Sequence, residues 1–472
     1  MVMQSWLNYD PPSAKRVQSL VEYMRTETDL PIENETLNLV LKAWAKKKNA
    51  ERAQAYFDQM VKQQQRKPDE SSFAYVLEAW SQSRSPLAAK RAEQLLARMK
   101  NDFNIEANVD CITRVIECWA KSKRLGAEKR IESLMSHMRH LIDDNNSSNK
   151  SIPNDDCDPL LVQEAMYNVL QAYQYVKNAH RAEELLLEYA DEYHHNNRYP
   201  LSLKMCMSVL TTWSKSKSSR RGYRAEKLLL LMESDDSFPD PTVECYTAVL
   251  NCYAGSDKPD SAQRAEVLLR RMEQEVGIEA NLVSLTCVLI AWARSSDDAN
   301  AASKQAEKLF QEICDRNLDP DRYVYSGLIT AHGRSTSEDS IYKVEEYFQR
   351  VKDMQTTEEA EASGVVSVSR KPTVVEYTAT IQAYANYVTR NVDRSRMVVE
   401  RVGTLLDEML ESEDPLLKPN TLTYAAVLKA IAGALRLPDR GDRADAVLRT
   451  MQAERITPYI HGLAKKCHHH HH

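Results

Sequence analysis

The chain has 472 residues and a formal net charge of −6, and its 11 glycines are too few for a β-rich fold or a glycine-rich phosphate loop. No apolar run approaches the roughly 20 residues of a membrane-spanning helix, so no membrane insertion is expected. The nine cysteines show neither a Cys-x-x-Cys pair nor metal-ligand spacing, which favours small buried thiols in a reducing compartment.

The first predicted element is a helix over residues 16–24, and its sequence phrase returns along the whole chain. In full form the phrase reads basic-Ala-Glu-x-Leu-Leu-x-x-Met, as in residues 264–272. The alanine, the two leucines and the methionine stand at i, i+3, i+4 and i+7, which predicts one apolar stripe of an α-helix. The basic residue and the glutamate beside the alanine are predicted to face solvent. Copies begin at Arg16, Arg52, Arg91, Arg130, Arg181, Arg224, Arg264, Gln305, Lys343, Arg401 and Arg443.

A second phrase, Val-Leu-x-Ala-Trp, precedes each of the later copies and first occurs at residues 40–44. An apolar residue usually stands three positions before the valine, so these residues also follow a helix stripe. Each unit is therefore predicted to be a helical hairpin: helix A ends in the aromatic residue, and helix B carries the Leu-Leu-Met stripe. Equivalent buried or half-buried sites are predicted for Trp44, Trp80, Trp119, Trp213 and Trp292.

This self-similarity, with a period of about forty residues, predicts an all-α, right-handed α-solenoid of about ten helical-hairpin repeats. Residues 1–33 are expected to form a partial repeat, and residues 460–472 a tail that ends in a histidine tag. Two stretches interrupt the period, residues 140–158 and 353–371, and are expected to be surface loops. The full repeats are predicted to span residues 34–69, 70–108, 109–162, 163–202, 203–242, 243–281, 282–321, 322–373, 374–420 and 421–459.

No arrangement of residues that carries catalysis is found. The chain shows no nucleophile beside a general base and no paired carboxylates at catalytic spacing, and His194 with His195 lacks further ligands for a metal. We therefore expect no catalytic residue, no metal ligand and no cofactor. The sequence predicts a protein that binds and is not an enzyme.

The junction between repeats carries a third phrase. A proline, or an alanine in its place, is followed by a small polar residue and then by the first aromatic residue of helix A, as in Pro241-Thr242 before Tyr246. With the two helices, this pattern resembles the P-type pentatricopeptide repeat family over residues 10–459. The repeats are longer than usual and lack most glycines between the helices, as in the expanded repeats of algal members. The tetratricopeptide alternative needs an early Trp-x-x-Leu-Gly in helix A, and here the Trp ends that helix.

The resemblance implies single-stranded RNA binding with one base per repeat. In such proteins the base is read by a residue on the first turn of helix A, here called the reader, and by the last residue of the repeat, its partner. The pairs that match the family pattern are Asn38 with Asp69 for uracil, Thr247 with Asn281 and Thr378 with Asn420 for adenine, and Thr286 with Asp321 for guanine; Ser326 with Thr373 fits the pattern without a defined base. The other pairs of this chain, such as Ala74 with Asn108, do not match the family pattern.

A third position, three residues before the reader, should sandwich each base with an apolar side chain. Carboxylates at this position are unfavourable beside an RNA backbone, so base reading is expected mainly from residues 243–420. The apolar residues are Val283, Tyr323, Val375 and Leu422, whereas earlier repeats carry Glu35, Ser71, Asp110, Glu164, Lys204 and Glu244.

Basic residues recur two positions after the aromatic that ends helix A. One face of a regular stack would align them as a track for phosphates, which answers part of the objection that the chain is acidic. The alternative is that they complement the C-terminal end of the helix dipole, and both roles are compatible. These residues are Lys46, Lys121, Lys215, Arg294 and Arg334.

The leading hypothesis is a sequence-specific binder of single-stranded RNA that acts in organellar RNA stability, processing or translation by occupying its site. The family resemblance implies a mitochondrion or plastid, although no targeting segment is recognised in the sequence. The alternative is a helical-repeat adaptor that binds protein partners within a ribonucleoprotein. An RNA-cleaving or editing enzyme would need an additional catalytic domain.

Overall fold

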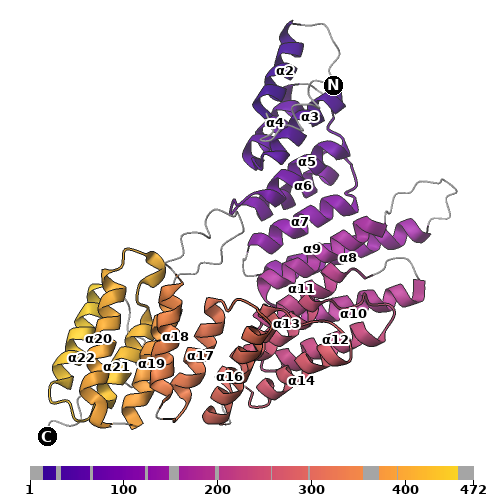
Figure 1. The fold of residues 1–472 in the computed structure, drawn as a ribbon. Coiled ribbons are helices and arrows are strands. Elements are labelled where there is room, and N and C mark those ends of the chain that lie inside the picture. The colour runs from indigo at the N-terminus through magenta and orange to yellow at the C-terminus, as the bar shows by residue number, and fades with distance from the viewer. Residues whose placement is uncertain are drawn as a thin grey trace. The chain divides into compact units, whose positions relative to one another are not determined.

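The computed structural model describes residues 14–27, 33–63, 67–122, 126–147, 159–196, 201–256, 258–295, 298–337, 339–354, 372–390 and 392–454. Within these ranges the secondary structure is entirely helical, with 21 α-helices, two short 3₁₀ helices and no strand (Figure 1). None of the described helices is long and apolar enough to cross a membrane. The predicted all-α class is confirmed.

The helices alternate as the two phrases predict. Helix A of the ten full repeats is α3 (Asn34–Lys46), α5 (Glu70–Gln82), α7 (Val109–Ser122), α9 (Pro159–Val176), α11 (Leu203–Lys215), α13 (Val243–Ala254), α15 (Leu282–Arg294), α17 (Arg322–Arg334), α19 (Val374–Arg390) and α21 (Thr421–Gly433). Helix B begins with α2 (Ala14–Glu27) of the partial repeat. It continues with α4 (Ala50–Gln63), α6 (Ala88–Asn101), α8 (Ala127–Ser147), α10 (Ala179–Asn196), α12 (Arg221–Ser234), α14 (Ser261–Gln274), α16 (Ala299–Asp315), α18 (Ser340–Asp353), α20 (Ser395–Glu411) and α22 (Arg440–Ala453).

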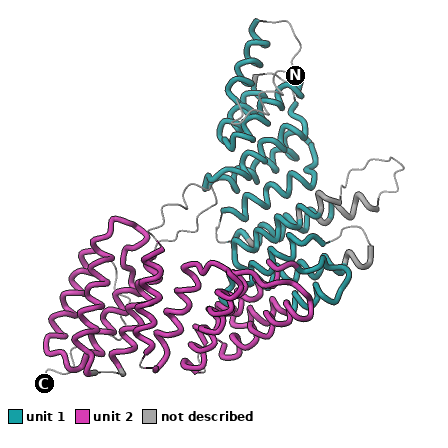
Figure 2. Tube along the Cα trace, viewed as in Figure 1, with its two compact units in different colours: residues 1–217, 227–241 teal, residues 218–226, 242–472 magenta. Residues whose placement is uncertain are grey.

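The chain divides into two compact units (Figure 2). Unit 1 contains residues 1–217 and 227–241, and unit 2 contains residues 218–226 and 242–472. Inside each unit, successive A helices pack against one another, and a helix A typically packs against the helix B on each side, as α15 does against α14 and α16. Each unit is therefore a stack of hairpins, which confirms the predicted repeat solenoid.

The apolar stripes form the core of the stack. In α14 the stripe residues Ala265, Leu268 and Met272 are all buried. Four of the five predicted tryptophans are buried and Trp119 is half-buried, so that prediction is confirmed as well.

The helix A cysteines also belong to this core. Burial raises the pKa of four of their thiols to about 12, which makes them small packing groups and poor nucleophiles. These are Cys111, Cys118, Cys252 and Cys287.

The two predicted loops are only partly within the described residues. Helix α8 continues to Ser147, so the expectation of a loop from residue 140 is wrong for its first part. Residues 148–158 and 355–371 lie outside the described residues.

The glutamate of the helix B phrase does not simply face solvent, and here the prediction was wrong. Nε1 of Trp292 donates a 2.9 Å hydrogen bond to the carboxylate of Glu266 in the preceding helix B. A buried indole N–H or phenol O–H needs an acceptor, and in most repeats the preceding repeat supplies it. Trp119 is an exception, because its Nε1 has no hydrogen-bond partner among the described residues. We call the contact between Trp292 and Glu266, and its equivalents in other repeats, the inter-repeat clamp. The other clamps are Trp44–Gln18, Trp80–Gln54, Tyr173–Glu132, Trp213–Glu183, Tyr253–Glu226, His332–Glu307 and Tyr384–Glu345.

The basic residue of the helix B phrase joins several of these clamps. Nζ of Lys343 lies 2.7 Å from the Glu307 carboxylate, and the hydroxyl of Tyr347 donates to the same oxygen at 2.8 Å. Arg401 pairs in the same way with Glu345. Helix B of one repeat is thus joined to both helices of the next repeat by a single carboxylate.

The last repeat lacks both halves of the clamp. Ile431 stands where a donor aromatic would be, and Gly403 stands where the acceptor would be. A cavity of about 230 Å³ is lined there by Gly403, Ile431 and neighbouring apolar side chains of α20, α21 and α22. The acceptor and the donor are lost together, as expected if each exists to satisfy the other.

Gly403→Ala should stabilise the protein by about 0.5–1 kcal/mol, because glycine is unfavourable inside a helix and the new Cβ would meet no atom within 4 Å. Urea unfolding followed by circular dichroism measures the change. The matched control is Gly327→Ala, whose Cβ would collide with the side chain of Leu289 and should lower the unfolding midpoint. A lower midpoint for Gly403→Ala would contradict the prediction.

The clamp at Glu307 should make stability depend on acidic pH. Burial acts to raise the pKa of Glu307, but hydrogen bonds from His332, Lys343 and Tyr347 outweigh it and lower that pKa from 4.5 to about 2. Because the folded-state pKa is the lower one, the stabilisation is complete above about pH 4.5 and is lost as the pH falls toward 2. Glu307→Gln should therefore destabilise the protein at pH 7 by on the order of 1–3 kcal/mol, and by less at pH 3.

Thermal unfolding at pH 7, 5 and 3 tests this dependence. The control is Glu346→Gln in α18, whose side chain is 54% exposed and pairs with Arg350 one turn along the same helix. It should change stability little at any pH. If the difference in unfolding temperature between Glu307→Gln and the unsubstituted protein stays constant with pH, the lowered pKa of Glu307 does not contribute to stability and the prediction is wrong.

Candidate nucleic-acid interface

The predicted partner residues are the N-caps of the following helix A. Asp69 accepts a 2.8 Å hydrogen bond from the backbone N–H of Ser72. Asn281, Asp321 and Asn420 accept equivalent bonds at the starts of α15, α17 and α21. Asp and Asn are favoured at this position because they satisfy helix N–H groups that lack intrahelical acceptors. The partner thus has a structural role besides the one that the resemblance implies.

The first reader meets its partner directly. Nδ2 of Asn38 donates to both carboxylate oxygens of Asp69, at 3.0 and 3.1 Å. The hydroxyl of Ser72, the third residue of α5, lies 2.7 Å from Oδ1 of Asn38 and 2.8 Å from Oδ1 of Asp69. The three side chains form one network that joins two repeats.

In two adenine pairs the reader is connected to its partner through a hydroxyl at the position of Ser72. The hydroxyl of Thr247 lies 2.8 Å from that of Ser284, which lies 2.9 Å from Oδ1 of Asn281. Likewise, Thr378 contacts Thr423 at 2.8 Å, and Thr423 donates to Asn420 at 3.2 Å. We call this third residue of helix A the bridging residue, because it connects the reader to its partner.

Sequence reasoning missed the bridging residues. Their signal is the capping-box spacing, in which an N-cap residue is followed three positions later by a side chain that bonds back to it. Asp69 with Ser72 and Asn420 with Thr423 form complete capping boxes.

The guanine pair departs from this arrangement. Like Thr247, which donates to the backbone oxygen of Val243, Thr286 donates its hydroxyl to a backbone oxygen, that of Leu282 at 2.7 Å, and Thr286 is 5% exposed. Val324 occupies the bridging position and has no polar group. The structure therefore places Thr286 and Asp321 at equivalent sites without connecting them.

Apolar side chains at the third position are exposed in the last four repeats of unit 2, whereas the first repeat of that unit carries the exposed Glu244 there. Val283, Tyr323, Val375 and Leu422 are 55%, 45%, 59% and 71% exposed. Large apolar side chains held in water at equivalent positions indicate a binding surface. In unit 1 the same position carries exposed Glu35, Ser71, Glu164 and Lys204 and the half-buried Asp110, whose carboxylate pairs with Arg114.

The basic track has a partly structural role. Nζ of Lys121 donates to the backbone oxygen of Ser81 at 2.6 Å, and Arg334 donates to that of Ala293 at 3.0 Å. Both carbonyls belong to the last turn of the preceding helix A, so these two residues favour the helix-end interpretation. The other track residues, Lys46, Lys215 and Arg294, have exposed side chains.

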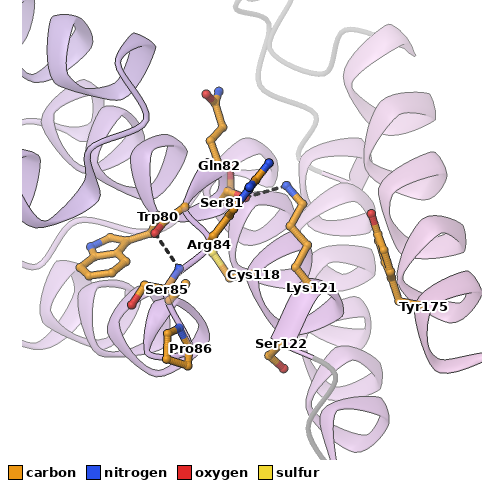
Figure 3. Close-up of a pocket in the computed structure, with 12 residues that line it drawn as sticks. Trp80, Ser81, Gln82, Arg84, Ser85, Pro86, Cys118, Lys121, Ser122 and Tyr175 are labelled. Atoms are coloured by element: carbon orange, nitrogen blue, oxygen red, sulfur yellow. Dashed lines mark hydrogen bonds between the residues drawn. The ribbon is translucent and has the colours of Figure 1, made fainter. Parts of the chain in front are cut away.

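In unit 1 the track passes a pocket of about 610 Å³ (Figure 3). Gln82, Lys121 and Tyr175 occupy the track position of three successive repeats and all line it, together with the exposed Arg84. Two cations beside an exposed aromatic ring suit a phosphate and an unstacked base. Among the described residues there is no cluster of three or more His, Cys, Asp or Glu side chains that could hold a metal.

Comparisons by sequence find no match, either to a family model or to a curated protein. Solved structures do match. A crystal structure of the pentatricopeptide repeat protein PPR10 in complex with an 18-nt psaJ RNA element superposes with a TM-score of 0.52 at 17% sequence identity. The match covers 96% of this chain and 59% of that chain, and a cysteine-to-serine variant of PPR10 with the same RNA gives the same values. The chain thus spans less than two thirds of PPR10, and it has the fold of a pentatricopeptide-type repeat solenoid, as its sequence predicts.

Proposed function

We propose that this chain binds single-stranded RNA in a sequence-specific manner, with one base per repeat over residues 243–420. The carrying observation is the alternation in unit 2 of reader–partner pairs with exposed apolar side chains. Val283 and Tyr323 stand on either side of the pair that ends at Asp321, as a sandwich for one base requires. The two matching PPR10 structures contain an 18-nt RNA element.

The base assignments follow the family pattern. Thr247 with Asn281 reads adenine, Thr286 with Asp321 reads guanine, and the pair that ends at Asn420 reads adenine. The core is therefore adenine, guanine, an unassigned base and adenine, from 5′ to 3′ along the chain. Binding energy comes from stacking and phosphates, and discrimination comes from hydrogen bonds to base edges.

Occupation of the site is the proposed mode of action. A protein that covers its target RNA can stabilise it, define a processed end or change its translation without breaking a bond. The family resemblance supports an organellar transcript as the target.

Unit 1 is proposed to hold RNA mainly through its track and the pocket beside Arg84. Only Asn38 with Asp69 matches a family pair there. The carboxylates at the third position of unit 1 also support the alternative, in which this unit binds a protein partner within a ribonucleoprotein. Affinity purification after RNase treatment separates the two, because a protein adaptor keeps its partners when RNA is removed.

Thr286→Asn should move the second base of the core from guanine toward uracil, because Asn with Asp321 repeats the Asn38–Asp69 pair. The double variant Thr286→Asn/Val324→Ser should complete the shift, since it adds the bridging hydroxyl that Ser72 provides. Losing a directional pair of hydrogen bonds to a buried base edge costs on the order of 1–3 kcal/mol, or at least about ten-fold in relative binding.

Selection from randomised RNA measures this preference. Thr404→Asn, at an exposed site on helix B, is the control and should leave the core unchanged. If selection with the unsubstituted protein enriches no such core, the one-base-per-repeat proposal is wrong.

The track residues should separate by salt dependence. Each phosphate contact to a single strand adds about 0.7 to the slope of log affinity against log salt. Lys215→Ala should flatten the slope by about this amount for any RNA sequence. Lys121→Ala and Arg334→Ala should mainly lower stability, because both side chains bond helix-end carbonyls. An equal effect of all three substitutions on the slope would contradict this division.

A further inference from the structure

One reader–partner pair is bridged by a carboxylate where other bridged pairs have a hydroxyl. Glu376 occupies the bridging position of α19, and it is 1% exposed. The hydroxyl of Ser326 donates to its Oε1 at 2.6 Å. The hydroxyl and the backbone N–H of Thr373 donate to its Oε2 at 2.7 and 2.8 Å. The reader and its partner are thus both bonded to Glu376.

A carboxylate determines the hydrogen positions in this network. An ionised carboxylate only accepts, and each hydroxyl has a single proton. Ser326 and Thr373 therefore both direct their protons at Glu376 and keep only lone pairs for a ligand. Thr373 also accepts a long 3.3 Å bond from the backbone N–H of Val375, which leaves it one lone pair.

The hydroxyl bridges in other repeats impose no such direction. Ser284 has one proton for two neighbours, Thr247 and Asn281, so each hydroxyl in that network can turn between donating and accepting. The same holds for Thr423 between Thr378 and Asn420. Among the bridges that the described residues form, the acceptor-only pair is particular to Glu376.

We propose that Glu376 is a specificity-determining residue that makes the protein select guanine as the third base of the RNA core. This inference rests on the proposed RNA-binding function. The Watson–Crick edge of guanine presents two adjacent donors, N1–H and N2–H₂, which match two acceptor oxygens. Adenine and cytosine pair one donor with an acceptor, and uracil has one donor between two acceptors. The exposed side chains of Tyr323 and Val375 flank the site and would hold the base against the pair.

The test uses the full chain and four RNAs with the core adenine-guanine-X-adenine in constant flanks. Fluorescence anisotropy should show X = guanine bound at least about ten-fold more tightly than the other three. Glu376→Ser introduces the bridging hydroxyl that Ser284 provides in another repeat. It should reduce the preference for guanine to less than about three-fold, while discrimination at the second and fourth bases persists. Glu411→Ser, at an exposed site on α20, controls for the loss of one negative charge and should keep the guanine preference.

A second variant covers the case in which serine leaves a cavity. Glu376→Gln keeps the shape but adds an amide donor, which frees one hydroxyl proton for the ligand. The preference should then move from guanine toward adenine, whose edge offers a donor beside an acceptor.

The outcomes separate the inference from the function on which it rests. Equal binding of all four RNAs, with the second and fourth bases still discriminated, overturns the role of Glu376 and leaves RNA reading intact. Guanine preference that survives both Glu376 variants also overturns it. Failure to bind any of the RNAs, or any selected sequence, overturns the proposed function itself.

Discussion

The inter-repeat clamp is the interaction on which the rest of the structure depends. A buried indole or phenol donor cannot be left unpaired without a cost of roughly 1–3 kcal/mol. The acceptor lies in helix B of the preceding repeat, as Glu266 does for Trp292. In four repeats the carboxylate also pairs with the basic residue of the next helix B, so that one side chain holds three helices. These carboxylates belong to Glu132, Glu226, Glu307 and Glu345. A hairpin of this chain is therefore complete only beside its neighbour.

The clamp also explains how reader and partner come together. It holds successive A helices side by side, so the first turn of one helix lies next to the N-cap of the following one. At Asn38, Ser72 and Asp69 the result is a network that caps a helix and joins two repeats. The side chains that we propose to read a base thus also cap a helix. A substitution at a partner residue should affect stability as well as specificity, whereas one at an exposed third position should not.

The sequence predicts elements well and contacts between repeats poorly, for a physical reason. Apolar periodicity and the Pro-Asp or Pro-Asn junctions reflect forces inside one hairpin, so helices, N-caps and buried tryptophans follow from local pattern. The role of Glu266 depends on a residue in the next repeat, and such pairs lie 25 to 41 residues apart along the chain. Periodicity within one helix places a glutamate beside the stripe in solvent. The sequence does contain one sign of the clamp: the repeat that lacks the donor aromatic, at Ile431, also lacks the acceptor, at Gly403.

Under the proposed function, the third position, three residues before the reader, would determine where hydrogen bonds can discriminate between bases. A base sandwiched between exposed apolar groups such as Val283 and Tyr323 excludes water, so a mismatched donor or acceptor loses its partner without replacement. Beside Glu35 or Glu164 water remains, and a mismatched group can bond to it at little cost. Carboxylates there also repel the phosphates that a bound strand would bring close. Unit 1 and unit 2 can therefore share one fold and one kind of bridging network, and still differ in whether the identity of a base changes the binding free energy.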